Sequence, residues 1–224
     1  MSLKYLNSLL CPDKHIDLPQ LKKHARQINK NITVIDIDIT SHHSDSKNGI
    51  FEIAMLHINP KGNIAWTSGF INPERDLSAH ISQLLGVSDD FLTRNPNWKE
   101  GWSEALSHIA KNHLLIGFGL VDYILPVIQS QHERYGETIP VFNDIIDIRS
   151  LYCFHKHKRA KLSDLTQFYG VPLAERHRVQ NDVAAISLVT EKMINEYGNN
   201  LFSDKHRTWS TALLAPSGYT PLSI

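Results

Sequence analysis

The sequence predicts an α/β fold: a mixed five-stranded sheet with helices on both faces. Residues 32–40 alternate strictly, with Thr33, Ile35, Ile37 and Ile39 on one side, as expected for a strand. Two further strand-like runs follow directly, whereas later ones are separated by segments with helical spacing. The length of 224 residues, of which 42% are hydrophobic, is enough for one core of ordinary domain size.

The first three strands form an antiparallel meander. Residues 50–58 and 64–71 flank Asn59-Pro60-Lys61-Gly62-Asn63, which has the composition of a hairpin turn. Short apolar runs at 113–117 and 145–148 supply two more strands. Helical spacing occupies the segments between and after them, which are residues 79–85, 98–109, the segment after Asp122, and residues 150–154, 162–169 and 179–193.

The chain divides into a main domain and two extensions. Residues 1–31 are interpreted as an N-terminal arm carrying a short amphipathic helix, and residues 32–197 as the domain. Residues 198–224 have no clear periodicity and contain prolines, so we expect an irregular C-terminal extension. No internal repeat is evident.

Composition excludes several classes of protein. Lys plus Arg and Asp plus Glu both number 23, so no uniformly basic surface indicates a nucleic-acid partner. The most apolar run, residues 114–121, is far shorter than the roughly 18 residues of a membrane span, so no membrane association is expected. Cys11 and Cys153 are too few for a disulfide scaffold, and the N-terminus does not resemble a secretion signal. We therefore expect a cytoplasmic protein; nothing indicates its oligomeric state.

Asp36 and Asp38 stand two apart on an apolar strand, so their side chains leave the same face about 7 Å apart. If the strand is buried, repulsion and desolvation force one carboxyl to take a proton, unless a cation lies between them. A divalent metal site is one interpretation. An exposed strand end with two solvated acids is the other, and for an isolated Asp-x-Asp it is the commoner case.

Further acids stand near the starts of helices. Asp122 follows the apolar strand, and Pro126 requires a helix to begin close to it, so a helix cap is the simple alternative. Asp182 lies on the apolar stripe of the helix over 179–193, and His177 is on the loop that leads into it. Since four Asp and one His occupy comparable positions, convergence on one site is the simplest explanation.

In order and spacing these residues resemble the histidine-containing DEDD 3′-to-5′ exonucleases, which include ribonuclease T and the proofreading subunit of bacterial replicative polymerase. The resemblance covers about residues 32–195. It rests on Val34-Ile35-Asp36-Ile37-Asp38, Glu52-Ile53-Ala54, the segments 71–73 and 85–92, the stretch 115–122, the segments 162–165 and 169–171, and His177-Arg178-Val179-Gln180-Asn181-Asp182. No single motif is specific, but the ordered set is.

The resemblance implies a ribonuclease H-like fold and two-metal hydrolysis of phosphodiester bonds at the 3′ ends of single-stranded DNA or RNA. Asp36 would bridge two divalent cations, Mg²⁺ or Mn²⁺, which oxygen ligands favour. Asp38 and Asp182 would complete one cation site and Asp122 would support the second. His177 would accept the proton of the attacking water. Residues 32–197 are accordingly expected to be the exonuclease domain.

The sequence departs from the family at several positions. Asp38 stands where the family has Glu, which shortens the reach of this side chain by about 1 Å. Gly117 and Phe118 replace the usual His-Asn, and Phe118 either stacks on a base or fills core. Weaker candidates for substrate binding are Ile39 and Thr40 after the first motif, Phe118, and the basic residues Lys156, Lys158 and Arg159.

Two alternatives to the exonuclease remain open. One is a catalytically degenerate relative that binds nucleic acid with the same fold. The other is a phosphodiesterase for small oligonucleotides. Because all four Asp and the His are present, we favour the active exonuclease.

Overall fold

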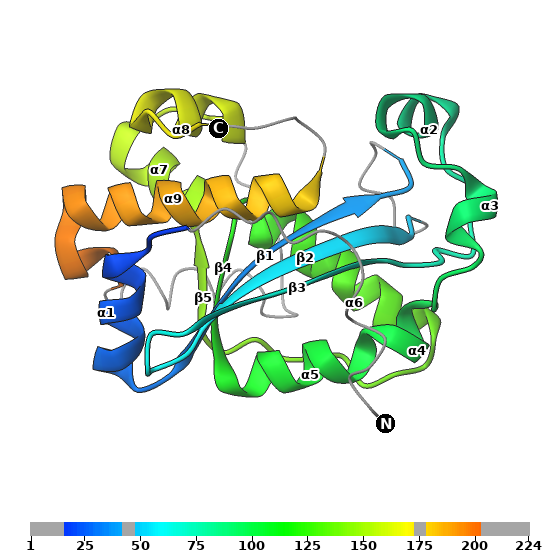
Figure 1. The fold of residues 1–224 in the computed structure, drawn as a ribbon, viewed down its shortest axis with the longest axis horizontal. Helices are drawn as coiled ribbons and strands as arrows, with labels where there is room; N and C mark the ends of the chain where they lie inside the picture. The colour runs from blue at the N-terminus through cyan, green and yellow to red at the C-terminus, as the bar shows by residue number, and fades with distance from the viewer. Residues whose placement is uncertain (1–15, 42–47, 173–177, 203–224) are drawn as a thin grey trace.

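The structure is a computed structural model, and it describes residues 16–41, 48–172 and 178–202 (Figure 1). Its centre is one sheet in the order β3-β2-β1-β4-β5. β1 pairs antiparallel with β2 and β2 with β3, whereas β4 runs parallel to β1 and β5 parallel to β4. The predicted mixed five-stranded sheet and its meander are confirmed. The strands are β1 (Asn31–Ile39), β2 (Ile50–Ile58), β3 (Ile64–Phe70), β4 (His113–Gly117) and β5 (Ile145–Asp147).

Helices occur where the spacing predicted them, but the short helix α3 was not predicted, residues 198–202 of the expected irregular extension form the 3₁₀ segment η3, and two further segments differ. The segment after Asp122 begins as a π-helical turn, η2, before the α-helix α6, and residues 98–109 form two helices instead of one. The helices are α1 (Pro19–Ile28), α2 (Ala79–Leu85), α3 (Asp89–Leu92), α4 (Trp98–Gly101), α5 (Ser103–Asn112), η2 (Leu120–Ile124), α6 (Leu125–Arg134), α7 (Ile148–Lys156), α8 (Leu162–Tyr169), α9 (Val179–Tyr197) and the 3₁₀ segment η3 (Gly198–Phe202).

Helices cover both faces of the sheet, as the sequence predicted (Figure 1). On one face α9 packs against β1 and β2, with Val183 and Ile186 buried against Val34 and Ala54. On the other, α4, α5 and α6 cover the alternate side chains of β1, among them Ile35 and Ile37. Each such side chain stabilises the fold by about 1.5–3 kcal/mol through its removal from water. The alternation of β1 therefore assigns its even-numbered side chains to the α9 face.

The helix predicted within residues 1–31 is α1, and it packs into the same core as the domain. Leu21 and Ala25 are fully buried on the α9 face. The first turn of α1 has no side-chain cap of its own. Instead the Glu191 carboxylate on α9 accepts hydrogen bonds from the amides of Gln20 (3.0 Å) and Leu21 (2.7 Å). α9 thus anchors α1, so this part of the arm is structurally part of the domain.

The described part of the C-terminal segment, residues 198–202, also packs against the domain. Leu201 and Phe202 of η3 are buried, and the Phe202 ring stacks on His24 of α1 at 3.7 Å. Residues 203–224 of the predicted extension lie outside the described residues. None of the helices described has the length and apolar character needed to cross a bilayer.

A pair of histidines lies at the edge of the sheet where β1 and β4 begin. The Thr33 hydroxyl lies 2.9 Å from His57 Nδ1 and 2.6 Å from His113 Nδ1. Burial lowers the pKa of His57 to about 4. Burial, reinforced by the neighbouring His57, His108 and Lys30 charges, does the same for His113. Both rings are therefore neutral in the folded protein at pH 6, and protonating them opposes folding.

We predict that this pair makes the fold acid-sensitive. A folded-state pKa below the unfolded value of about 6.5 means that stability is lost as pH falls from 6.5 towards 4, by an amount on the order of 2 kcal/mol. In His57→Gln this loss should be smaller, as measured by urea unfolding across that pH range. His80→Gln, an exposed position on α2, is the control. An unchanged pH dependence in His57→Gln would contradict the assignment.

Candidate active site

The candidate site lies at the edge of the sheet where the parallel strands β1, β4 and β5 end. Asp36 and Asp38 are in the last four residues of β1, and η2, which carries Asp122, follows β4. Because the carboxyl ends of parallel strands meet at one edge, the topology brings the first two predicted acidic motifs to the same end of the sheet.

Asp36 and Asp38 lie on the face that α9 covers. In the register with β2, Asp36 is opposite Ala54, and Asp38 is opposite Glu52. The first turn of α9 lies over this part of the sheet, since the Gln180 side chain donates a close hydrogen bond to the Ser68 hydroxyl of β3. Asp182 is in the same first turn of α9.

The electrostatics show that these carboxyls are neighbours. Burial raises the pKa of Asp36 well above its usual value, and the charges of Asp182, Asp38 and Glu52 raise it further. For Asp38, burial followed by the Asp182 charge raises the pKa to about 6. The third predicted motif, on α9, therefore converges with the first.

Glu52 is a fourth acid in this group. Burial, together with the Asp38 and Asp182 charges, raises the pKa of Glu52 to about 7, although the Arg178 guanidinium opposes the rise. Arg178 is the N-cap of α9 and lies over the Phe70 ring, 5.6 Å from its centroid. It also lowers the pKa of Asp38. We call Asp36, Asp38, Glu52 and Asp182 the carboxylate cluster.

Two oxygens of the carboxylate cluster have no partner in the described structure. Asp38 Oδ2 and Glu52 Oε2 are buried and accept no hydrogen bond from any described group. An ionised carboxylate only accepts hydrogen bonds, so such atoms call for a donor or a cation. Hard oxygen ligands of this kind fit Mg²⁺ or Mn²⁺. In the described residues no three His, Cys, Asp or Glu side chains form a ready-made metal site.

Asp122 occupies a different environment. Its carboxylate is half exposed and accepts a hydrogen bond of 2.6 Å from Arg149 Nη2 on α7. Arg149 also lies over the Phe118 ring at 5.6 Å and packs against Gly119, where a Cβ would stand 3.2 Å from the guanidinium carbon. Gly119 has φ +73°, a conformation that favours glycine. Neither the cap nor the metal interpretation anticipated this ion pair.

A buried aspartate shapes the turn that carries Asp122. Asp147, at the end of β5, is fully buried and accepts hydrogen bonds from the amides of Gly119 (2.9 Å) and Val121 (3.3 Å). The same carboxylate caps α7 through the amides of Arg149 and Ser150. Asp147 thereby fixes Asp122 and its partner Arg149 relative to each other.

Tyr123 connects this turn with the carboxylate cluster. Burial raises the pKa of its phenol, and so do the charges of Asp36 and Asp38. The residue next to Asp122 is therefore close to both strand acids. η2 lies beside the carboxylate cluster, while the Asp122 carboxylate is held by Arg149.

His177 lies outside the described residues, so its predicted role as proton acceptor stays a prediction. The side chain of Ile39 is buried in the core on the face away from the carboxylate cluster. The Thr40 hydroxyl is also buried and accepts a hydrogen bond of 3.1 Å from the Gly49 amide. Phe118 is half-buried beneath Arg149. Because the Ile39 side chain is buried, a substrate could contact this residue only through its backbone.

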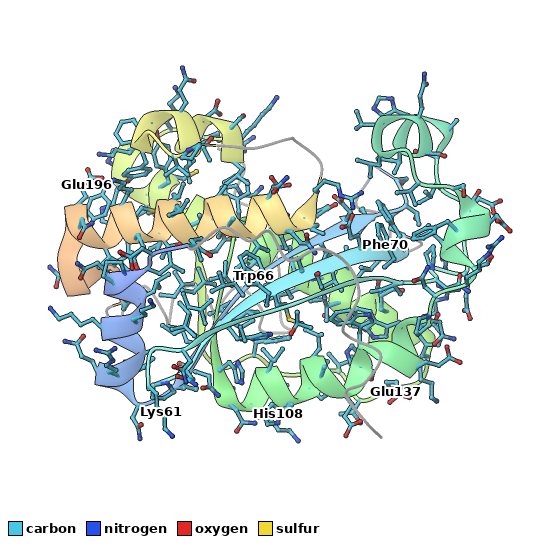
Figure 2. The ribbon with its side chains drawn as sticks, in the orientation of Figure 1. Lys61, Trp66, Phe70, His108, Glu137 and Glu196 are labelled. Atoms are coloured by element: carbon cyan, nitrogen blue, oxygen red, sulfur yellow. The ribbon has the colours of Figure 1, made fainter. Side chains whose placement is uncertain are left out.

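Of the basic candidates, Lys156 is already paired. Its ammonium lies 2.6 Å from the Glu196 carboxylate on α9 and 5.0 Å from the Phe168 centroid. Figure 2 shows Glu196 at the end of α9 opposite to Phe70. Glu196 is fourteen residues beyond Asp182 along α9, a rise of about 21 Å. Lys158 and Arg159 are exposed on the loop after α7.

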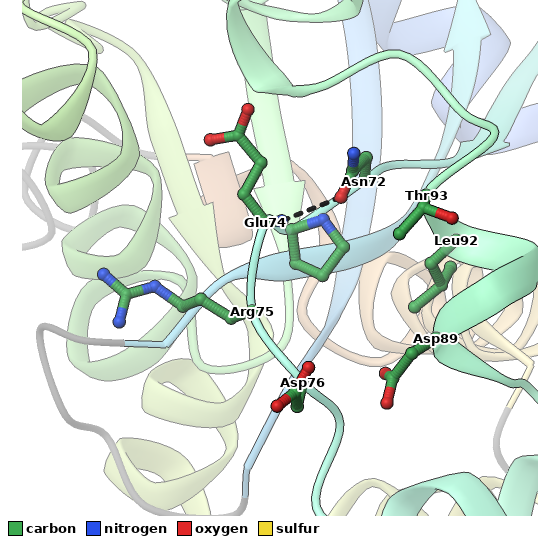
Figure 3. A pocket seen from close by; sticks show the side chains of 8 residues that line it. Asn72, Glu74, Arg75, Asp76, Asp89, Leu92 and Thr93 are labelled. Atoms are coloured by element: carbon green, nitrogen blue, oxygen red, sulfur yellow. Dashed lines mark hydrogen bonds between the residues drawn. The ribbon is translucent and has the colours of Figure 1, made fainter.

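A surface pocket beyond the end of β3 is separate from the carboxylate cluster (Figure 3). Glu74, Arg75, Asp76 and Asp89 are among the residues that line it. The Asn72 side chain accepts a hydrogen bond of 2.9 Å from the Glu74 amide, and Asp89 accepts one of 2.9 Å from the Leu77 amide. These hydrogen bonds hold the chain between β3 and α3, and none of the predicted site residues lines the pocket.

Sequence reasoning assigned no role to several residues that shape the site: Glu52, Tyr123, Asp147, Arg149 and Arg178. For Glu52 a signal was present, because a charged residue inside an otherwise apolar strand is unusual. Arg149 offered none, since its contact with Asp122 depends on how α7 is placed against η2.

Residues 33–190 match the RNase_T family, described as Exonuclease. The match spans more than half of the chain, which therefore belongs to this family of exonucleases. The described fold and the order of the acidic motifs agree with that membership.

The curated relatives that the chain matches include proteins named DNA polymerase III PolC-type. The protein of Caldanaerobacter subterraneus is 26% identical over 165 residues, which is 73% of this chain and 11% of the relative. That of Streptococcus pneumoniae strain D39 is 25% identical over 199 residues, 85% of this chain and 13% of the relative. The chain thus spans about an eighth of the length of these relatives.

Among solved structures, the nuclease domain of 3′hExo, a DEDDh family member bound to rAMP, superposes with a TM-score of 0.64 at 20% identity. It covers 75% of this chain and 94% of its own. Escherichia coli exonuclease I in complex with a dT13 oligonucleotide has a TM-score of 0.60 at 13% identity, covering 77% and 42%. These likenesses establish the fold as that of the ribonuclease H-like DEDDh exonucleases.

We predict that the carboxylate cluster destabilises the metal-free protein at neutral and alkaline pH. A folded pKa of about 6 for Asp38, above the unfolded 3.8, means that stability present at low pH is lost as pH rises through 6. Without added metal, Asp38→Asn should therefore be more stable than the parent at pH 8, by about 2 kcal/mol, and not at pH 4. Urea unfolding at both pH values measures this.

The exposed Asp76→Asn serves as the control, since it removes the same charge outside the carboxylate cluster. A parent protein as stable as Asp38→Asn at pH 8 would show that Asp38 is not repelled by its neighbours.

Proposed function

We propose that this chain is a metal-dependent 3′-to-5′ exonuclease that hydrolyses the terminal phosphodiester bond of single-stranded DNA or RNA. The observation that carries this proposal is the convergence of Asp36, Asp38 and Asp182 on one face of the sheet, at the edge where β1 and β4 end. Membership of an exonuclease family supports it.

The carboxylate cluster suits Mg²⁺ or Mn²⁺, and two such ions are proposed, as in the family that the chain resembles. Asp36 would lie between them, and Asp38 and Asp182 would complete one site. When bound, such ions lower the pKa of an attacking water and stabilise the leaving 3′ oxygen. Asp122, next to Tyr123 on η2, would support the second position, for which Arg149 has to give up its ion pair. His177 is proposed to take the proton of the water.

The chain's own residues also exclude water and orient the strand end. Glu52 and Phe70 form a buried floor beside Asp38, since they are opposite each other in the β2–β3 register. Arg178 supplies positive charge at the rim, where it faces Phe70. A single strand fits such a rim for two reasons. A base can stack on an aromatic ring without being part of a duplex, and the phosphate of the strand can contact the Arg178 guanidinium. The structural neighbours solved with rAMP and with dT13 support a single-stranded substrate.

The direct test uses a 5′-labelled single strand. We expect stepwise shortening from the 3′ end in Mg²⁺ or Mn²⁺, and none in EDTA. Asp36→Asn and Asp182→Asn should each lower the rate by at least about a hundredfold, because each removes a ligand from the proposed site. Asp90→Asn, an exposed acid on α3, should cleave at the parent rate. Full activity in Asp36→Asn would reject the proposal.

A second candidate is a relative that binds single strands without cleaving them. The ion pair between Arg149 and Asp122 favours this second candidate. The Arg149 guanidinium already neutralises Asp122, to which the resemblance assigns a metal ion. This candidate predicts retention of the labelled strand with no shortening at high protein concentration in Mn²⁺. Activity on very short oligonucleotides alone would instead indicate the phosphodiesterase.

The same ion pair yields a further prediction for the exonuclease. Arg149 and a divalent cation compete for the Asp122 carboxylate, so removing the guanidinium should favour the cation. In Arg149→Met, half-maximal cleavage should need severalfold less Mn²⁺ than in the parent. Arg94→Met, which loses an exposed ion pair with Asp90, is the control. A higher Mn²⁺ requirement in Arg149→Met would mean that Arg149 contributes to the site instead of competing for it.

A further inference from the structure

Glu52 is a buried acid to which the proposed chemistry assigns no cation and no proton. Its residue exposure is 4%, although carboxylates are almost never this buried unless they are paired. No described group donates a hydrogen bond to Glu52 Oε2. Replacing such a side chain with an apolar one would remove a desolvation cost, so its presence requires an explanation other than packing.

The position of Glu52 is fixed relative to Asp38. The two residues are opposite each other in the antiparallel register of β1 and β2, so their side chains leave the same face with Cβ atoms about 5 Å apart. Asp38 Oδ2 is likewise buried and without a partner. Two carboxylates thus lie side by side on adjacent strands, and each has one buried oxygen that accepts no hydrogen bond from a described group.

Among the described residues, no side chain forms an ion pair with either of these two acids. On the other side of Glu52, β3 presents Phe70, which is apolar and 8% exposed. Arg178 acts on both acids through its charge, but it forms no ion pair with Glu52 or Asp38. A small cation between the two acids would satisfy both oxygens.

The lengths of the two side chains explain why two acids are needed. Asp38 stands where the resembled family has Glu, and its reach is shorter by one methylene, about 1 Å. Glu52 carries that extra methylene on the neighbouring strand. We propose that Glu52 is an additional ligand of the divalent cation held by Asp36, Asp38 and Asp182, and that it supplies the reach that Asp38 lacks. This inference rests on the proposed function.

The test measures metal binding directly. Free Mn²⁺ is followed by electron paramagnetic resonance during titration of the parent, Glu52→Gln and Glu104→Gln, the last an exposed acid on α5. We expect Glu52→Gln to weaken Mn²⁺ binding by at least about tenfold and Glu104→Gln to leave it unchanged. Glutamine is isosteric and removes a buried charge, so the variant should fold, which its urea melt verifies.

A rescue variant separates the proposed compensation from a general need for charge. In Asp38→Glu/Glu52→Gln the longer acid is restored on β1, and Mn²⁺ affinity should return to within about threefold of the parent. Persistent loss in this double variant would contradict compensation between the two positions.

The outcomes distinguish this inference from the function on which it rests. If the parent neither binds Mn²⁺ nor shortens a labelled strand, both fail. If the parent does both and Glu52→Gln binds Mn²⁺ equally well, only the role of Glu52 is overturned. If Glu52→Gln keeps the Mn²⁺ affinity of the parent but has a raised KM for the strand, Glu52 contacts the nucleotide instead of the cation. That result would also overturn the inference.

Discussion

Mutual repulsion among buried carboxylates is the constraint on which the arrangement of this molecule depends. Burial raises the pKa of Asp36, Asp38 and Glu52, and neighbouring carboxylates raise it further: Asp182, Asp38 and Glu52 act on Asp36, Asp182 acts on Asp38, and Asp38 and Asp182 act on Glu52. Such a group costs folding energy in the absence of a cation. The fold tolerates that cost because the rest of β1 and β2 is packed on both faces by apolar side chains.

Two elements hold the acids together against this repulsion. The sheet fixes Asp36, Asp38 and Glu52 through backbone register, which side-chain charge cannot shift without breaking ladder hydrogen bonds. α9 brings Asp182 over them because its apolar stripe, including Val183 and Ile186, is buried against the same face. The hydrophobic core thus does the work of assembling charges that would otherwise separate.

Much of this was predictable from sequence for a physical reason. The alternation in β1 and the apolar stripe of α9 determine which faces are buried, and those faces place Asp36, Asp38 and Asp182 together. Strand β2 matched its predicted bounds because hairpin chemistry fixes register locally. The contact between Arg149 and Asp122 could not be predicted, because it depends on the turn that Asp147 holds, and no local pattern reports that turn. The unusual position of Glu52 inside an apolar strand could be recognised from the sequence. Its pairing with Asp38 could not, because that pairing depends on the cross-strand register of β1 and β2.

The carboxylate cluster and the ion pair of Asp122 with Arg149 divide the site into two halves with different electrostatics. In one half, two buried carboxylate oxygens accept no hydrogen bond from any described group, and in the other the Asp122 carboxylate is paired with Arg149 of α7. The most direct measurement is anomalous diffraction from crystals soaked with Mn²⁺. A manganese peak at about 2.0–2.2 Å from carboxylate oxygens of Asp36 and Asp182 is the result expected here. A soaked crystal in which these acids bind no manganese and point into separate regions would contradict the central claim.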